Sequence, residues 1–182
     1  MKNKSNVYKM SIIAVMAAVI CILGPLSIPI GPVPISFTNL AIFISLYTLG
    51  MKKGTMSYII YMFIGFVGVP VFSGFSSGPS KLLGPTGGYL IGFILMALIA
   101  GFFIDKYFDK IYLCFAGMVL GDIVCYIVGT AWLAYQANMS LSAALAVGVI
   151  PFIPGDLVKI LISAWIGPKI RKRLIKAGLF EI

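Results

Sequence analysis

Charged and catalytic side chains are scarce in this chain of 182 residues. Only 10% of the residues are charged, against roughly 25% in a soluble domain, and histidine is absent. The three cysteines, Cys21, Cys114 and Cys125, stand singly inside apolar segments. These absences exclude a histidine-based catalytic triad, a histidine metal site and a paired-cysteine motif. We therefore expect neither an enzyme nor a metalloprotein.

Long uncharged apolar runs make up most of the chain. Apolar residues account for 60% of it, and no charge interrupts residues 10–51, 54–80, 82–104 and 123–155. A helix that spans the lipid bilayer needs only about 20 predominantly apolar residues. The sequence therefore predicts an all-α, polytopic integral membrane protein.

Clusters of glycine and proline divide the apolar runs into six predicted transmembrane helices. The fourth is expected to follow a glycine-rich stretch at 73–88, and the last to continue through the Pro151–Pro154 interruption. Six helices leave no room for a second domain, so residues 1–182 are expected to form one. The expected helices cover about residues 9–28, 36–50, 55–69, 89–104, 111–135 and 143–170.

The net charge of +9 is distributed between the apolar runs and forms no basic stripe, so a nucleic-acid partner is not expected. Basic residues favour the cytoplasmic side of a membrane. Placing both termini in the cytoplasm puts twelve of the 14 basic residues there, and the opposite orientation reverses this distribution. The twelve are Lys2, Lys4, Lys9, Lys52, Lys53, Lys106, Lys110, Lys169, Arg171, Lys172, Arg173 and Lys176.

Three charged residues fall inside predicted membrane spans, namely Asp122, Asp156 and Lys159. Each costs about 2.5–3.5 kcal/mol at the bilayer centre, so each is a functional candidate. Asp156 and Lys159 are three residues apart and share one helix face, where both can reach one cavity. Two structural alternatives stay open: Asp156 caps a helix start after Pro154 and pairs with Lys159, and Asp122 bonds to a neighbouring helix.

The glycine-rich segment at 74–89 is a second candidate for ligand binding. Glycine lets the backbone approach a ligand closely, and a helix starting near Thr86 would offer free N–H groups to an anion. A tight turn between helices is the alternative explanation. The segment lacks the spacing of a Walker loop, so it does not predict a phosphate site.

Small residues share one face of the first predicted helix, with Ala14 and Ala18 four residues apart and Ala17 beside them. Such faces allow close packing of helices in lipid. The spacing leaves open whether the partner helix is internal or belongs to another protein.

Three motifs, in this order, resemble the BioY family, the biotin-specific S components of energy-coupling-factor (ECF) transporters. They are Gly31-Pro32-Val33-Pro34-Ile35-Ser36, Gly84-Pro85-Thr86-Gly87-Gly88-Tyr89 and Pro151-Phe152-Ile153-Pro154-Gly155-Asp156-Leu157-Val158-Lys159.

The resemblance implies a six-helix protein of a prokaryotic cell membrane with cytoplasmic termini. It implies capture of biotin from outside, and association with one transmembrane coupling protein (the T component) and two ATPases. The alanine-rich face of the first helix would contact the T component. The ligand site would include the 84–89 segment, Asp156 and Lys159.

The chemistry of biotin suggests roles for these candidates, with biotin as the ligand and no cofactor. A lysine suits the carboxylate and points to Lys159, while an aspartate suits the ureido N–H groups and points to Asp156 and Asp122. Aromatic walls suit the apolar ring. Phe72, Phe75 and Tyr89 are predicted near the same outer surface and could supply these walls.

Two further hypotheses concern transport. The rival function is a self-sufficient, proton-coupled vitamin permease in which Asp122 gains and loses the proton. Within the binding-subunit hypothesis, the segments at 24–34 and 74–88 could form a lid over the outer pocket, since proline stiffens the first and glycine loosens the second. Fixed connectors are the alternative.

Overall fold

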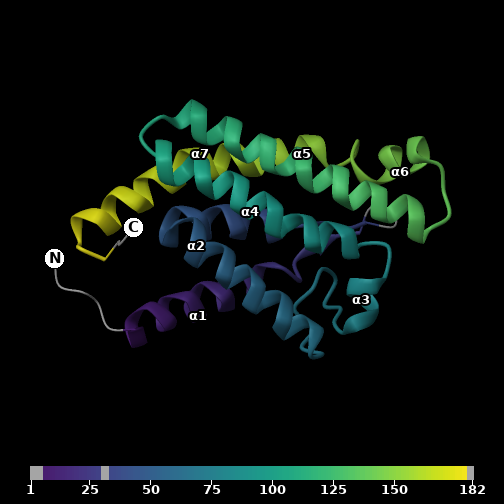
Figure 1. Ribbon diagram of the computed structural model, residues 1–182, viewed down its shortest axis with the longest axis horizontal. Helices are drawn as coiled ribbons and strands as arrows, with labels where there is room; N and C mark the ends of the chain where they lie inside the picture. Colours follow the sequence, from purple (N-terminus) through teal and green to yellow (C-terminus); the bar gives the residue numbers. More distant parts are fainter. Residues whose placement is uncertain (1–5, 30–32, 180–182) are drawn as a thin grey trace.

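Seven α-helices and one short strand pair make up the described part of the chain, residues 6–29 and 33–179 of a computed structural model (Figure 1). The all-helical class predicted from the sequence is confirmed. The elements are α1 (Asn6–Leu23), β1 (Ser27–Ile28), β2 (Ile35–Ser36), α2 (Thr38–Phe66), α3 (Pro79–Leu83), α4 (Gly87–Tyr107), α5 (Ile111–Gln136), α6 (Leu141–Gly148) and α7 (Ile153–Lys176).

The first helix is shorter than predicted, because α1 ends at Leu23 and not near residue 28. The backbone of Gly24 packs directly against Tyr61. A Cβ at this position would be only 2.7 Å from the Tyr61 hydroxyl oxygen. Pro25 then has no N–H to continue the helix. The chain instead forms a small antiparallel pair, in which Ser27 lies opposite Ser36.

The second and third predicted helices are the two arms of α2, which has a sharp break at Gly50 (φ 80°, ψ 174°). This left-handed φ favours glycine. The expected linker at 51–54 is wrong, because these residues already belong to the second arm. The Met51 amide donates to Asp105 Oδ2 at 2.8 Å, which fixes the break. Figure 1 shows the two arms running in different directions.

The last predicted helix is two helices, since α6 and α7 meet at an angle of 49°. Pro151 lies in the break and lacks an amide hydrogen, whereas Pro154 is tolerated within the first turn of α7. The α6 start is capped by the Ser140 hydroxyl, which accepts from the Ala143 amide at 3.3 Å. The predicted continuous helix through Pro151–Pro154 is therefore wrong.

Three described helices, α1, α4 and α5, are long and apolar enough to cross a membrane, and the bent α6–α7 pair would make four. Each arm of α2 is shorter than the about 20 residues that a straight span needs. The six predicted segments correspond to α1, the two arms of α2, α4, α5 and α7.

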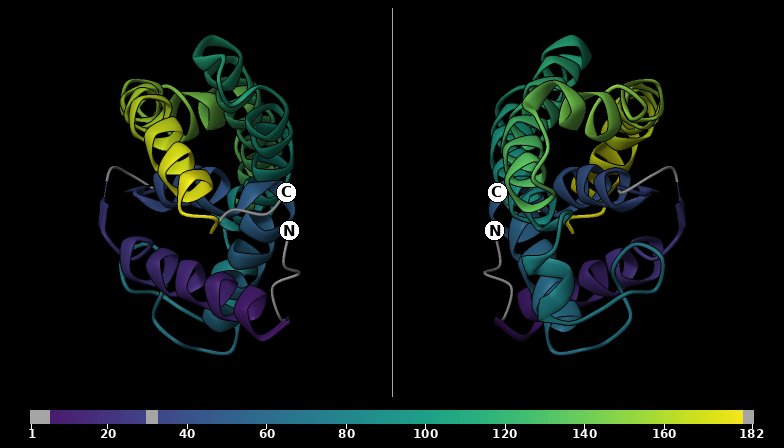
Figure 2. Two further views of the ribbon diagram at one scale, coloured as in Figure 1. Left: turned by 90° about the vertical axis from the view of Figure 1, so that its left-hand side faces the viewer. Right: turned by 90° about the vertical axis from the view of Figure 1, so that its right-hand side faces the viewer.

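The helices pack around α2, which contacts α1, α4 and α7, while α5 lies along α4 and also contacts α6 and α7. Figure 2 shows α4 and α5 side by side, with α7 across from them and α1 at the opposite edge. The α1 start and the α7 end lie at the same end of the molecule (Figure 1).

A buried ionic cluster holds that end together. Arg171 of α7 is 0% exposed, and its guanidinium donates to the Ile104 carbonyl at 3.1 Å and to Asp105 Oδ1 at 2.7 Å. Because the other oxygen of Asp105 accepts from Met51, the cluster links α7, α4 and the α2 break.

Candidate functional site

A cavity that is partly open to solvent lies toward the other end of the bundle. The starts of α2, α4 and α7 and the middle of α5 supply most of its walls. Tyr61 from the second arm of α2, Lys81 from α3 and the connections between helices supply the rest. It is lined by Val33, Pro34, Ser36, Thr38, Asn39, Tyr61, Ser73, Lys81, Thr86, Tyr89, Leu90, Phe93, Asp122, Cys125, Tyr126, Phe152, Asp156 and Lys159.

Asp156 is the centre of a hydrogen-bonded group in this cavity. Its Oδ1 accepts from Asn39 Nδ2 and from Lys159 Nζ, each at 2.8 Å. Its Oδ2 accepts from the Tyr126 hydroxyl. Lys159 Nζ also donates to the Ser36 carbonyl at 2.7 Å. We call these five residues the Asp156 cluster.

The cluster brings together three helices and the β2 strand around one buried ion pair. Asp156 and Lys159 are both buried, and burying paired charges is tolerated only when further hydrogen bonds satisfy them. Asp156 and Lys159 form the expected pair, and the pair lines the cavity. The expected cap by Asp156 is not formed, because the N-cap of α7 is Phe152 and no described side chain accepts a hydrogen bond there.

Asp122 lines the same cavity from α5 and differs from Asp156 in having an unused acceptor. The residue is 5% exposed, and its Oδ2 has no hydrogen-bond partner among the described residues. An unpaired buried acceptor costs about 1–3 kcal/mol, so a donor supplied by a ligand would be favourable there. The expected bond from Asp122 to a neighbouring helix is not formed at this oxygen.

Two predicted residues of the 84–89 segment, Thr86 and Tyr89, also line the cavity. The Tyr89 hydroxyl donates to the Gly148 carbonyl at 3.0 Å and lies 3.3 Å from the Thr130 hydroxyl. Gly129 makes room for its ring, because a Cβ there would be 2.2 Å from Tyr89. These contacts fix the position of the Tyr89 ring, which forms part of the cavity wall.

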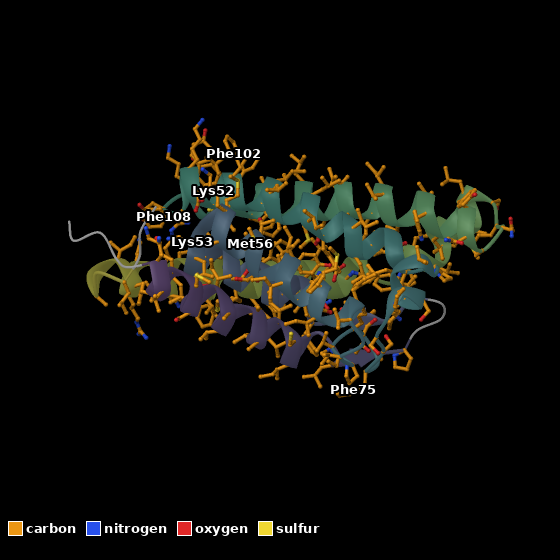
Figure 3. The ribbon with its side chains drawn as sticks, turned by 60° about the horizontal axis from the view of Figure 1, so that its bottom comes forward. Lys52, Lys53, Met56, Phe75, Phe102 and Phe108 are labelled. Atoms are coloured by element: carbon orange, nitrogen blue, oxygen red, sulfur yellow. The ribbon has the colours of Figure 1, made fainter. Side chains whose placement is uncertain are left out.

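The other predicted site residues, Gly88, Phe72 and Phe75, lie outside the lining of the cavity. A Cβ on Gly88 would be 2.3 Å from Trp132 Cβ, so this glycine serves the close packing of α4 on α5. Phe72 is buried against Tyr61, with ring centroids 5.6 Å apart. Phe75 is 65% exposed and projects from the surface in Figure 3. None of these three lines the cavity.

Sequence reasoning missed several wall residues, above all Asn39, Tyr126 and Lys81. Asn39 carries a signal, since an amide inside an apolar run needs a partner. Tyr126 follows Asp122 by four residues and so shares its helix face. Lys81 is one of the two basic residues outside the twelve assigned to the cytoplasm, and the charge distribution alone gives it no role in the site.

Both segments of the hypothetical lid reach the cavity. Val33 and Pro34 line it from the first segment, and Lys81 and Thr86 from the second. The Gly74 amide also donates to the Pro25 carbonyl at 3.1 Å. Gly31 and Pro32 lie outside the described residues. The lid's movement stays a prediction.

The small-residue face of α1 divides in two. Ala14 and Ala18 are exposed, whereas Ala17 is only 1% exposed and faces the interior of the protein. Ala17 therefore packs inside the protein. Of the three alanines, only Ala14 and Ala18 are accessible to a partner helix.

The sequence and the fold are both similar to those of known proteins. The sequence profile of the BioY family matches residues 1–176. The chain is 36% identical to the biotin transporter BioY of Thermotoga maritima over 158 residues, covering 87% of this chain and 92% of that protein. It is 32% identical to the biotin transporter BioY2 of Lactococcus lactis subsp. cremoris, covering 91% of each.

A crystal structure has the same fold. It is that of the S-component for biotin from an ECF-type ABC transporter, with a TM-score of 0.86 and 35% sequence identity. The similarity covers 94% of this chain and 95% of that one.

Proposed function

The chain belongs to the BioY family, and from this premise we propose that it is the biotin-binding S component of an ECF-type ABC transporter. The observation that carries the proposal is the Asp156 cluster, which gives a membrane protein a cavity lined by fixed polar groups. The protein's task is to bind and release, and it catalyses no reaction. Biotin is the transported ligand, and no cofactor is needed.

The cavity offers partners for the ureido head of biotin, which has two N–H donors and one carbonyl acceptor. Lys159 has three N–H donors, of which the described contacts use two, so one is left for the ureido carbonyl. The unused oxygen of Asp122 can accept from a ureido N–H. Tyr61, Tyr89, Phe93 and Phe152 supply the apolar walls that suit the ring.

We infer that partner proteins supply the energy for import, because the sequence has no Walker loop. We infer that the partners are a T component and two ATPases of an ECF module. The exposed Ala14 and Ala18 on α1 would allow close approach of a T-component helix.

The orientation proposed for the protein in the prokaryotic cell membrane places both termini in the cytoplasm. Figure 3 shows Lys52 and Lys53 toward the end of the molecule opposite to Phe75. That end also holds the start of α1 and the end of α7, and basic residues favour the cytoplasmic side. The cavity then faces the outside. Lys2 and Lys4, which contribute to the charge distribution, lie outside the described residues.

Direct binding tests the proposal. Titration of the purified full chain in lipid nanodiscs should show one saturable site for biotin, and Asp156→Asn should weaken it at least about 10-fold through the loss of charge-assisted bonds. Asp109→Asn is the matched control, because Asp109 is exposed and pairs with Lys172 outside the cavity. Absence of biotin binding to the parent chain would refute the proposal.

Uptake separates the proposal from the proton-coupled permease. Cells that carry the chain and an ECF module with inactive ATPases should accumulate no biotin, whereas the permease hypothesis requires uptake that depends on the proton gradient alone. ATPase-independent accumulation that collapses with that gradient would favour the permease.

A further inference from the structure

Two carboxylates, Asp122 and Asp156, and two ammonium groups, Lys81 and Lys159, line the described walls of the cavity, and of these only Asp156 and Lys159 form an ion pair. The cations on its described walls are Lys81 and Lys159. Lys159 is neutralised by Asp156 at 2.8 Å. The ammonium of Lys81, in contrast, has no hydrogen bond or ion pair to any described residue. On the described walls, Lys81 is therefore the cation without an ion-pair partner.

Lys81 belongs to a different part of the site from the Asp156 cluster. It lies on α3, in the connection between α2 and α4, whereas the cluster is formed by β2, α2, α5 and α7. None of the cluster's hydrogen bonds reaches Lys81. The ureido ring and the carboxylate lie at opposite ends of biotin, so a ligand whose head meets the cluster presents its carboxylate to another wall.

We propose that Lys81 is the residue that recognises the carboxylate of the ligand, while Lys159 serves the ureido head. This assignment rests on the proposed function and moves the carboxylate from Lys159, where residue chemistry alone had put it. The side chain of Lys81 is half-buried, and this burial lowers the pKa of its ammonium group below the usual value of a lysine. A carboxylate beside it would offset that penalty.

Two ligands and three variants test the assignment by titration of the full chain in nanodiscs. Lys81→Met should weaken biotin about 10- to 100-fold, the range for a charge-assisted hydrogen bond, and leave biotinamide unchanged. Lys81→Arg should restore much of the preference for the acid. Lys110→Met removes an exposed charge outside the cavity and is the matched control, with both affinities unchanged.

Each other outcome overturns the assignment. Equal losses for biotin and biotinamide would make Lys81 a structural residue, and no loss for either would leave it outside the site. A parent chain that binds neither ligand would instead refute the proposed function, and this assignment with it. A parent chain that binds both equally well would refute the carboxylate contact alone.

A chemical label on the unmodified chain avoids any dependence on variant folding. The N-hydroxysuccinimide ester of biotin carries an activated acyl carbon where biotin has its carboxylate. The neutral amine of the nearest lysine attacks that carbon, an amide bond forms, N-hydroxysuccinimide leaves, and the amine's proton passes to solvent. Peptide mapping should find the label on Lys81, and excess free biotin should suppress it. Biotin-suppressible labelling of Lys159 in its place would overturn the proposal.

Discussion

At the residue scale, the site depends on how buried charges are satisfied. Asp156 accepts three hydrogen bonds, and Lys159 donates to both Asp156 and a backbone carbonyl. Removing one partner of a buried pair leaves an uncompensated charge, which costs more than removing both. The two residues should therefore behave as a unit in folding and in ligand binding.

Lys159→Met should lower the free energy of unfolding by about 3–5 kcal/mol, because Asp156 is left buried without its cation. The double variant Lys159→Met/Asp156→Asn should recover part of this loss, since the amide carries no charge and can still accept a hydrogen bond from Asn39. Denaturation in detergent measures both. A double variant less stable than Lys159→Met would contradict the paired role.

At the element scale, glycines decide where helices approach and where they break. Gly88 and Gly129 allow α4 and α5 to lie in close contact, and Gly50 lets α2 turn. The helix α1 differs, because it packs mainly on α2 and leaves Ala14 and Ala18 exposed. This outer face is where we propose that a helix of the T component packs.

Ala18→Trp should prevent assembly with the T component and ATPases while leaving biotin binding intact, because the bulky ring blocks close helix approach far from the cavity walls. Co-purification of the module with the tagged chain measures assembly. Phe63→Trp is the control, since Phe63 is an exposed aromatic residue on α2. Normal assembly of Ala18→Trp would show that α1 is not the docking face.

At the scale of the whole molecule, two polar groups hold opposite ends of the bundle. The Asp156 cluster joins α2, α5 and α7 at the cavity, and Arg171 with Asp105 joins α2, α4 and α7 at the other end. The second group contains no cavity wall residue. It should therefore contribute to stability and not to ligand contact.

Arg171→Met should lower the free energy of unfolding by about 2–4 kcal/mol, because Asp105 and the Ile104 carbonyl lose their charged donor. Arg173→Met, an exposed position two residues away, should change it by less than about 0.5 kcal/mol. Unfolding of the two variants, followed with and without biotin, measures the loss of stability in each and shows whether the stabilisation by ligand is retained. Equal effects would mean that the buried cluster is not a stabilising contact.

The sequence predicted the helical class and the approximate places of the membrane segments, because apolar runs and their interruptions are local properties. It also predicted Asp122, Asp156 and Lys159 as candidate site residues, because charged side chains are costly inside apolar segments, and all three line the cavity. It could not predict the Gly50 break, which depends on Asp105 in another helix. For the same reason, it could not tell Phe72 and Gly88, which pack the core, from Lys81, which faces the cavity.

The location of the cavity at one end of the bundle has a kinetic consequence. A site that opens to one compartment equilibrates with that compartment alone, so under the proposed function the isolated subunit would capture ligand without accumulating it. With an association rate constant of about 10⁶ M⁻¹s⁻¹, a dissociation constant of about 1 nM would mean a residence time of roughly a quarter of an hour. Turnover on any shorter timescale requires the partner proteins to speed release, and the polar contacts that make capture selective are the ones they must break.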